Sequence, residues 1–184
     1  MTGRTTTGVP PRATALSGGT DGPRALRPLL ETVLDALAEG TAARGGPVPA
    51  TTPAALAEQI ARTLAELAPP PDGTGDEALH RLTALLAQGS TDPADPCCAA
   101  HLHCPPLALA VAADLAAGAL NPSQDSWDQA PAATALETLL IRELAALTGY
   151  PPDTAAGVLT SGGTESNLMG LLLARDRVLT RASG

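Results

Sequence analysis

The sequence predicts a mostly helical fold with one short strand near the end of the chain. Of the 81 hydrophobic residues, 37 are alanine and 29 are leucine, whereas valine and isoleucine together number only 8. Alanine and leucine are strong helix formers, and the β-branched residues that favour strands are scarce. The leucines also recur at the spacing of one helix face. A length of 184 residues fits about one domain.

The first half of the chain predicts a tail followed by helices. Residues 1–23 are rich in Thr, Gly, Pro and Arg without apolar periodicity, so we expect a disordered tail. Residues 24–89 predict three amphipathic helices. Gly40 is expected just after the end of the first helix, and Thr52 and Pro53 are expected to cap and open the second. The three apolar stripes are Leu26, Leu29, Leu30, Val33 and Leu37; Leu56, Ile60, Leu64 and Leu67; and Leu79, Leu82, Leu85 and Leu86.

The second half of the chain alternates polar loops with helices. Residues 91–106 and 121–130 are polar and rich in turn-forming residues, which predicts two irregular loops. One helix is expected between these loops, and another is expected to begin at Pro131 and to end at Gly149. The apolar run 156–160 is typical of a buried strand. The turn after it leads into a last helix with Leu168, Leu171, Leu172 and Ala174.

Charge and hydropathy exclude several partners. The formal net charge is −8 and the 11 basic residues are scattered, so the chain lacks the basic patch that binds nucleic acid. The N-terminus has no signal-peptide core, and the longest apolar stretch, 107–120, is short and contains Asp114, so no membrane span is expected. Three cysteines are an odd number, which argues against a disulfide framework and favours the reducing cytoplasm.

Every basic residue of the chain is an arginine, and none is a lysine. A lysine amine is the group that forms a Schiff base with a carbonyl cofactor or substrate. We therefore expect no chemistry of that kind from this chain by itself.

The most informative local pattern is the step into the last helix, Ser161-Gly162-Gly163-Thr164. Two glycines allow a sharp turn and a close approach of a ligand to the backbone, and Thr164 is expected to cap the new helix. The free N–H groups and positive dipole end of a helix suit a phosphate. However, the pattern is neither a dinucleotide-binding nor a P-loop motif, and a tight connection without any ligand uses the same residues. Both interpretations stay open on the pattern alone.

The loop 91–106 contains Cys97, Cys98 and Cys104 together with His101 and His103. Adjacent cysteines followed by a His-x-His-Cys string do not match the spacing of structural zinc sites, so we expect no metal. The plainer interpretation is a loop with small thiols and hydrogen-bonded imidazoles.

Two other residues have plain interpretations. His80 is expected at the surface or at the edge of the core. Trp127 is surrounded by Asp125, Ser126, Asp128 and Gln129, a setting too polar for a simple core. We expect either a pocket rim or a subunit contact there.

Three ordered segments resemble the group II pyridoxal-phosphate decarboxylases, and most of all their L-2,4-diaminobutyrate branch. The resemblance covers residues 90–178 closely and the earlier helices only in arrangement. The segments are His101-Leu-His-Cys-Pro-Pro106; Asn121-Pro-Ser-Gln-Asp-Ser-Trp-Asp-Gln-Ala-Pro-Ala-Ala-Thr134 with Leu136-Glu137; and Thr160-Ser-Gly-Gly-Thr-Glu-Ser-Asn-Leu-Met-Gly-Leu-Leu-Leu-Ala-Arg-Asp176.

This resemblance implies an α/β subunit of fold type I, the fold of many pyridoxal-phosphate enzymes. It implies that residues 24–89 form a helical segment that clasps a partner subunit in a dimer. It further implies that residues 90–184 form an incomplete start of the large domain that binds the cofactor, pyridoxal 5'-phosphate.

The resemblance also implies roles for single residues. Gly163 and Thr164 correspond to the loop that binds the cofactor phosphate. His103 and Cys104 correspond to a loop beside the substrate carboxylate. The segment with Asp125 and Trp127 corresponds to a loop that reaches the active site of the neighbouring subunit.

Family members carry further essential residues beyond the region matched here, including the Schiff-base lysine and the aspartate that pairs with the pyridine nitrogen. We therefore expect an N-terminal fragment or subunit of a decarboxylase acting on an amino acid like L-2,4-diaminobutyrate, inactive alone because no lysine is present. It is either a truncated product or one half of a split enzyme that a C-terminal partner chain completes. The alternative is a non-catalytic interaction module that binds a full-length decarboxylase or such a partner chain. A third interpretation is a marginally folded product.

Overall fold

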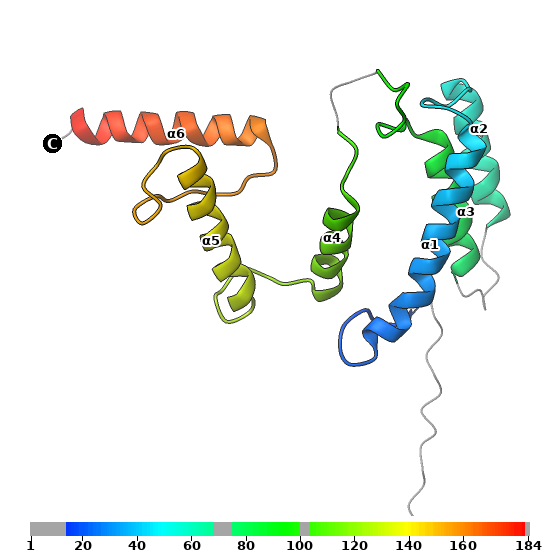
Figure 1. Ribbon diagram of the computed structural model, residues 1–184, viewed down its shortest axis with the longest axis horizontal. Coiled ribbons are helices and arrows are strands. Elements are labelled where there is room, and N and C mark those ends of the chain that lie inside the picture. The colour runs from blue at the N-terminus through cyan, green and yellow to red at the C-terminus, as the bar shows by residue number, and fades with distance from the viewer. Residues whose placement is uncertain (1–13, 68–74, 100–103, 183–184) are drawn as a thin grey trace, which may run out of the picture. The chain divides into compact units, whose positions relative to one another are not determined.

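The computed structural model describes residues 14–67, 75–99 and 104–182, and within these ranges the chain forms helices and no strand (Figure 1). The chain divides into two compact units, Met1–Asn121 and Pro122–Gly184. The helices are α1 Gly22–Arg44, α2 Pro53–Glu66, α3 Asp76–Gly89, α4 Ala108–Leu120, α5 Pro131–Leu147 and α6 Gly163–Ala182. Within the described part of the chain, every helix is too short or too polar to span a bilayer.

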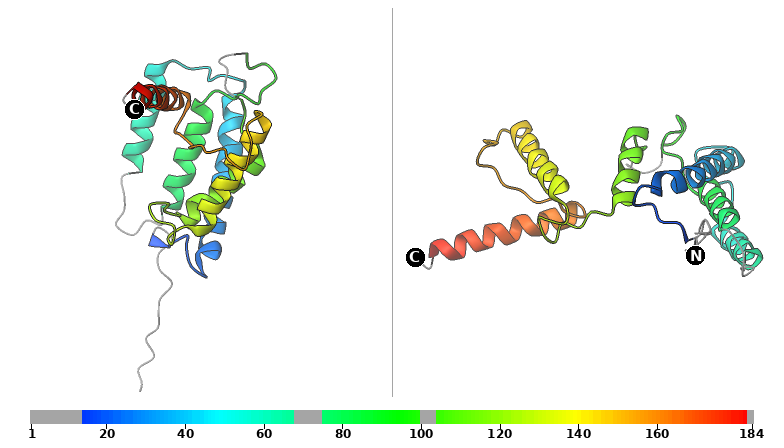
Figure 2. Two further views of the ribbon diagram at one scale, coloured as in Figure 1. Left: turned by 90° about the vertical axis from the view of Figure 1, so that its left-hand side faces the viewer. Right: turned by 90° about the horizontal axis from the view of Figure 1, so that it is seen from below.

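In the first unit, α1 and α3 pack side by side and run in the same direction (Figures 1 and 2). Residue numbers increase in the same direction along both helices, because Glu39 lies beside His80 and Arg44 lies beside Ala87. The His80 side chain is 34% exposed, which confirms its predicted place at the edge of the core.

The small residues of α1 and α3 set how closely the two helices approach. A Cβ atom at Gly40 would lie 2.1 Å from the carbonyl oxygen of Ala84 and 2.7 Å from Cβ of Ala87. The helix continues past Gly40 to Arg44, and Gly45 ends it with a left-handed φ of 72°. The prediction that Gly40 follows the end of the first helix is therefore wrong. This glycine is needed for packing, and Gly45 supplies the left-handed residue.

The second helix, α2, runs antiparallel to α3. The side-chain N–H of Gln59 donates to the side-chain oxygen of Gln88, near the end of α3, at an N–O distance of 3.3 Å. Glu66 forms an ion pair with Arg81, which lies nearer the start of α3. The predicted N-cap is confirmed, because Thr52 Oγ1 accepts a hydrogen bond from the N–H of Ala55 at 3.2 Å. Pro53 opens the helix at a position where no N–H is needed.

Little apolar surface is buried in the described residues. The buried hydrophobic side chains there are Ala36, Leu85 and Ala130. Leu86, predicted to point inward, is 67% exposed because it lies off the face of α3 that meets α1. The helix α4 is apolar around its circumference, and its exposed large residues are Leu109, Val111, Leu115 and Leu120.

The second unit contains α5, α6 and the connection between them. Pro131 opens α5 as predicted, and Gly149 takes a left-handed φ of 83° just beyond its end. The strand predicted at 156–160 is absent, since this run forms neither helix nor strand and its Val158 and Leu159 are 58% and 52% exposed. A strand needs a neighbouring chain segment for its hydrogen bonds, and the described residues offer none here.

Candidate functional site

The turn before α6 positions the residues that the sequence singled out. The carbonyl of Gly162 accepts the hydrogen bond from the N–H of Ser166 at 3.0 Å, which makes Gly162 the N-cap and Gly163 the first helical residue. Thr164 lies in the first turn and is not the cap that we predicted. The structure thus brings Gly163 and Thr164 together at the start of α6, where the backbone N–H groups have no partner within the helix.

Three hydroxyl groups and a carboxylate hold this turn. The Glu165 carboxylate accepts hydrogen bonds from the N–H and the hydroxyl of Ser161, at 2.8 and 2.6 Å. Thr160 Oγ1 donates to the carbonyl of Gly162 at 3.1 Å and lies 2.6 Å from Ser166 Oγ. Glu165 therefore reaches back over the turn, as in a capping box shifted by one residue. This arrangement leaves the N–H groups of Gly163 and Thr164 directed out of the helix end.

The donor end of α6 is open to solvent. Residues 161–168 are exposed, and a Cβ atom added at Gly162 or Gly163 would meet nothing within 4 Å. Behind the turn, Gly157 lies against α5, since its added Cβ would lie 3.1 Å from Cγ2 of Ile141. The turn is thus anchored on one side and accessible on the other, which suits the binding of an anion.

Hydrogen bonds from the side chain and then the backbone of Ser161 hold the pKa of Glu165 below its usual value. The folded pKa is lower than the unfolded pKa, so the stabilisation from this carboxylate is complete above the unfolded value. It is lost as the pH falls through the folded value. We expect acid titration below neutral pH to loosen the first turn of α6.

This expectation can be measured at the amide of Ser161 by NMR during an acid titration. Its chemical shift is expected to follow the protonation of Glu165, and E165Q should remove that titration while keeping the hydrogen bond to the side-chain oxygen. An unchanged titration in E165Q would assign the shift to another group.

The residues expected at the substrate side lie at the edge of the described chain. Cys104 is exposed at the start of the segment 104–107. His101 and His103 lie outside the described residues. Among the residues that are described, no group of three or more His, Cys, Asp or Glu side chains is placed to hold a metal ion.

The polar loop before α5 carries the other two candidate residues, Asp125 and Trp127. Trp127 is 70% exposed, so it is not a packing anchor within its own unit. Hydrogen bonds from the Ser126 side chain and from the backbone lower the pKa of the neighbouring Asp128. In the described residues, no hydrogen bond or ion pair links this loop to the start of α6.

Sequence reasoning missed Glu165 as the residue that organises the turn. It treated Thr164 as the cap because a hydroxyl directly after two glycines fits that role. An acidic residue in the first helical turn, three positions after Gly162, was the available signal.

Comparison with known proteins gives the family of this chain. Residues 60–183 match the family described as the pyridoxal-dependent decarboxylase conserved domain. An L-2,4-diaminobutyrate decarboxylase of Acinetobacter baumannii is 43% identical over 116 residues, which cover 62% of this chain and 22% of that protein. A protein of the same name from Rhizobium meliloti is 49% identical over 84 residues, covering 45% of this chain and 16% of its own length.

A solved structure extends the similarity to almost the whole chain. It is the glutamate decarboxylase domain of diaminobutyrate-pyruvate transaminase and L-2,4-diaminobutyrate decarboxylase from Vibrio parahaemolyticus. The TM-score is 0.77 at 32% identity, and the match covers 94% of this chain and 37% of that one. The chain spans about a fifth of the length of the curated relatives that it matches.

Proposed function

Because the chain belongs to the pyridoxal-dependent decarboxylase family, we propose that it supplies the N-terminal part of a pyridoxal-phosphate-dependent amino-acid decarboxylase. The observation that carries the proposal is the open donor end of α6, built from the residues that correspond to the phosphate-binding loop of the family. The names of the two bacterial relatives support a substrate like L-2,4-diaminobutyrate.

The start of α6 fits the phosphate of pyridoxal 5'-phosphate. Gly163 and Thr164 would hold it through their backbone N–H groups and the Thr164 hydroxyl, while Glu165 is engaged by Ser161 and turned away from these donors. When bound, the cofactor supplies an electron sink for the carbanion left by a departing carboxylate. The amine that would attach the cofactor covalently is not among these 184 residues, because none of them is a lysine.

The remaining roles follow the family correspondence. Residues 24–89 are proposed as a helical segment that contacts a partner subunit, and 90–184 as the start of the cofactor-binding domain. His103 and Cys104 are proposed beside the substrate carboxylate, and Asp125 and Trp127 at a subunit contact. The exposure of Trp127 supports this contact, since a large exposed aromatic side chain is typical of an interface. The three free thiols are consistent with a cytoplasmic protein.

Phosphate binding at α6 can be tested with Gly163→Pro. Proline is tolerated at the first helical position, where its missing N–H breaks no helical hydrogen bond. The variant therefore loses one phosphate donor without losing the helix. We expect the affinity for pyridoxal 5'-phosphate and for inorganic phosphate to fall about tenfold, as measured by NMR titration.

Gly163→Ala is the matched control, because it keeps the N–H and its Cβ would meet nothing within 4 Å. It is expected to bind phosphate more tightly than Gly163→Pro, because the N–H of residue 163 is kept. Equal binding by the proline variant, or no response of the amides at 163–165 to either ligand, would refute the proposed site.

A non-catalytic interaction module is the second candidate function. The observation that favours it is the set of exposed leucines on α5, which includes Leu136, Leu139 and Leu147 at 67%, 55% and 81% exposure. Co-purification with an intact decarboxylase, without any gain of activity when a C-terminal chain is added, would favour this module over the decarboxylase part.

A further inference from the structure

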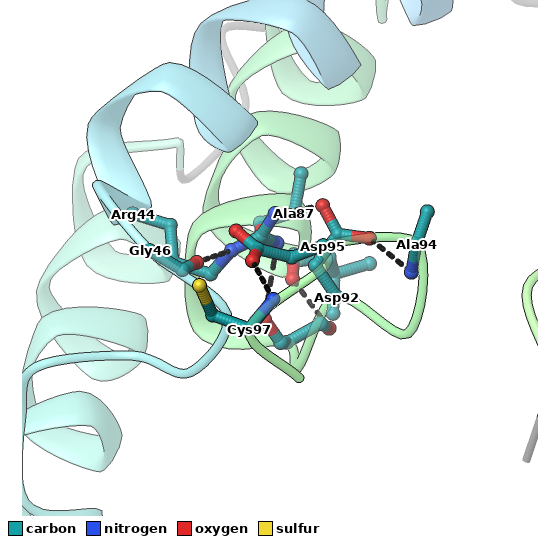
Figure 3. A network of polar contacts seen from close by, with 9 residues as sticks. Arg44, Gly46, Ala87, Asp92, Ala94, Asp95 and Cys97 are labelled. Atoms are coloured by element: carbon teal, nitrogen blue, oxygen red, sulfur yellow. Dashed lines mark hydrogen bonds and ion pairs between the residues drawn. The ribbon is translucent and has the colours of Figure 1, made fainter. Parts of the chain in front are cut away.

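The most extensively hydrogen-bonded side chain in the described residues is Arg44, at the end of α1 (Figure 3). Its Nε donates to the carbonyl of Gly46 at 2.7 Å, and one terminal nitrogen donates to the carbonyls of Ala87 and Ser90 at 2.8 and 3.1 Å. The other terminal nitrogen lies 2.6 Å from a carboxylate oxygen of Asp92. One guanidinium thus joins the end of α1, the end of α3 and the segment that follows α3.

The need for a cation here follows from the parallel course of α1 and α3. Their C-terminal ends meet, so two negative dipole ends and several carbonyls without helical partners converge at one place. The Arg44 side chain is only 5% exposed there, and Asp92, 27% exposed, balances its charge. A planar guanidinium with five N–H donors suits such a divergent set of acceptors, whereas an ammonium is a point charge.

The segment 90–98 is held through Asp92 and Asp95. The N–H of Asp92 donates to the carbonyl of Pro47 at 2.8 Å, and its carboxylate accepts from the N–H of Ala94 at 2.9 Å. Asp95 in turn accepts from the N–H of Cys97 through its carboxylate, at 2.8 Å, and from Cys98 through its carbonyl, at 2.9 Å. Arg44 therefore holds Asp92, and the adjoining Asp95 holds the turn that contains the two adjacent cysteines.

We infer that Arg44 is a positioning residue that sets the path of residues 90–98 as the chain leaves the helices α1 and α3. It acts through Asp92 and through the end of α3, and it holds the turn that presents Cys97 and Cys98. This role needs no cofactor and goes beyond the proposed function. Its consequence for a decarboxylase is that the N-terminal helices would fix the path of the first residues of the cofactor-binding domain.

The test compares Arg44→Ala with the unaltered 184-residue chain by hydrogen exchange and thiol alkylation. We expect amide exchange at Asp92, Cys97 and Cys98 to rise at least about tenfold, because these amides then open locally. The alkylation rate of the half-buried Cys98 should rise as well, relative to the exposed Cys97. Arg62→Ala is the matched control, since Arg62 is 65% exposed and forms an ion pair with Glu58 one turn away. It should leave both readouts unchanged.

Chemical rescue separates positioning by the guanidinium from a general loss of stability. Guanidinium ion at tens of millimolar, far below denaturing concentrations, should restore slow exchange in Arg44→Ala, whereas urea, a planar neutral analogue, should not. Asp92→Asn keeps the carbonyl acceptors and should give a smaller rise confined to residues 90–98. Unchanged exchange of these amides in Arg44→Ala, or equal rescue by urea, would overturn the inference. Phosphate binding at α6 is measured separately, so either result would leave the proposed function untouched.

Discussion

Gly40→Ala is expected to lower the free energy of unfolding of the α1–α3 pair by about 2–4 kcal/mol. The added methyl group would overlap the carbonyl oxygen of Ala84 at 2.1 Å and Cβ of Ala87 at 2.7 Å, and neither can rotate away because both are fixed to the α3 backbone. The helices would have to separate, which also stretches the Arg44 contacts at their ends. Alanine has the higher helix propensity by about 1 kcal/mol, so the steric cost must exceed that gain.

Gly170→Ala is the matched control for this measurement. Gly170 lies inside α6, and a Cβ atom there would meet nothing within 4 Å. Alanine at this position should therefore increase helicity, with a gain of up to about 1 kcal/mol. Denaturant unfolding followed by circular dichroism checks both variants. A Gly40→Ala protein as stable as the unaltered chain would mean that α1 and α3 do not pack this closely.

The 184-residue chain is expected to acquire no pyridoxyl group on any side chain when it is mixed with pyridoxal 5'-phosphate and then reduced with borohydride. The reason is compositional, since the chain has no lysine amine to react. Mass spectrometry of the intact chain and of its peptides gives the result directly. The α-amino group is the one amine available, so a label at Met1 is the background to be mapped.

Adding a second chain that contains a lysine tests whether the present chain contributes to cofactor binding. The portion of the Acinetobacter baumannii relative beyond the matched region can be added before reduction. If the present chain contributes the phosphate donors, the label should appear on the added chain and increase with the amount of the 184-residue chain. If labelling of the added chain does not depend on the amount of the 184-residue chain, the two chains do not share the cofactor site as proposed. A label on an internal residue of the present chain would contradict the compositional argument.

Features that depend on neighbours in the sequence were predictable. The cap by Thr52, the opening prolines of α2 and α5, and the polar loop around Trp127 all follow from residues within one or two turns. The family was predictable too, because its motifs are continuous segments, and the match over residues 60–183 confirms it. The identity of the cofactor comes with the family.

Features that depend on distant segments were not predictable. Gly40 was interpreted as a helix end because glycine is common there, whereas its packing against Ala84 depends on a residue 44 positions away. In the sequence Arg44 is one of several scattered basic residues, whereas three of its four acceptors in the structure are 43 to 48 positions away. The strand at 156–160 is absent for a related reason, since an apolar run does not show whether a neighbouring segment is present to bury it and to complete its hydrogen bonds.

The apolar circumference of α4 determines when this helix consolidates during folding. A helix with one apolar stripe is complete once a single surface covers it, but α4, whose one charged residue is Asp114, has to be enclosed from several directions. Such enclosure requires segments that are far apart in sequence, and contacts of that kind form late. Until they form, the exposed apolar surface of α4 favours aggregation and capture by chaperones.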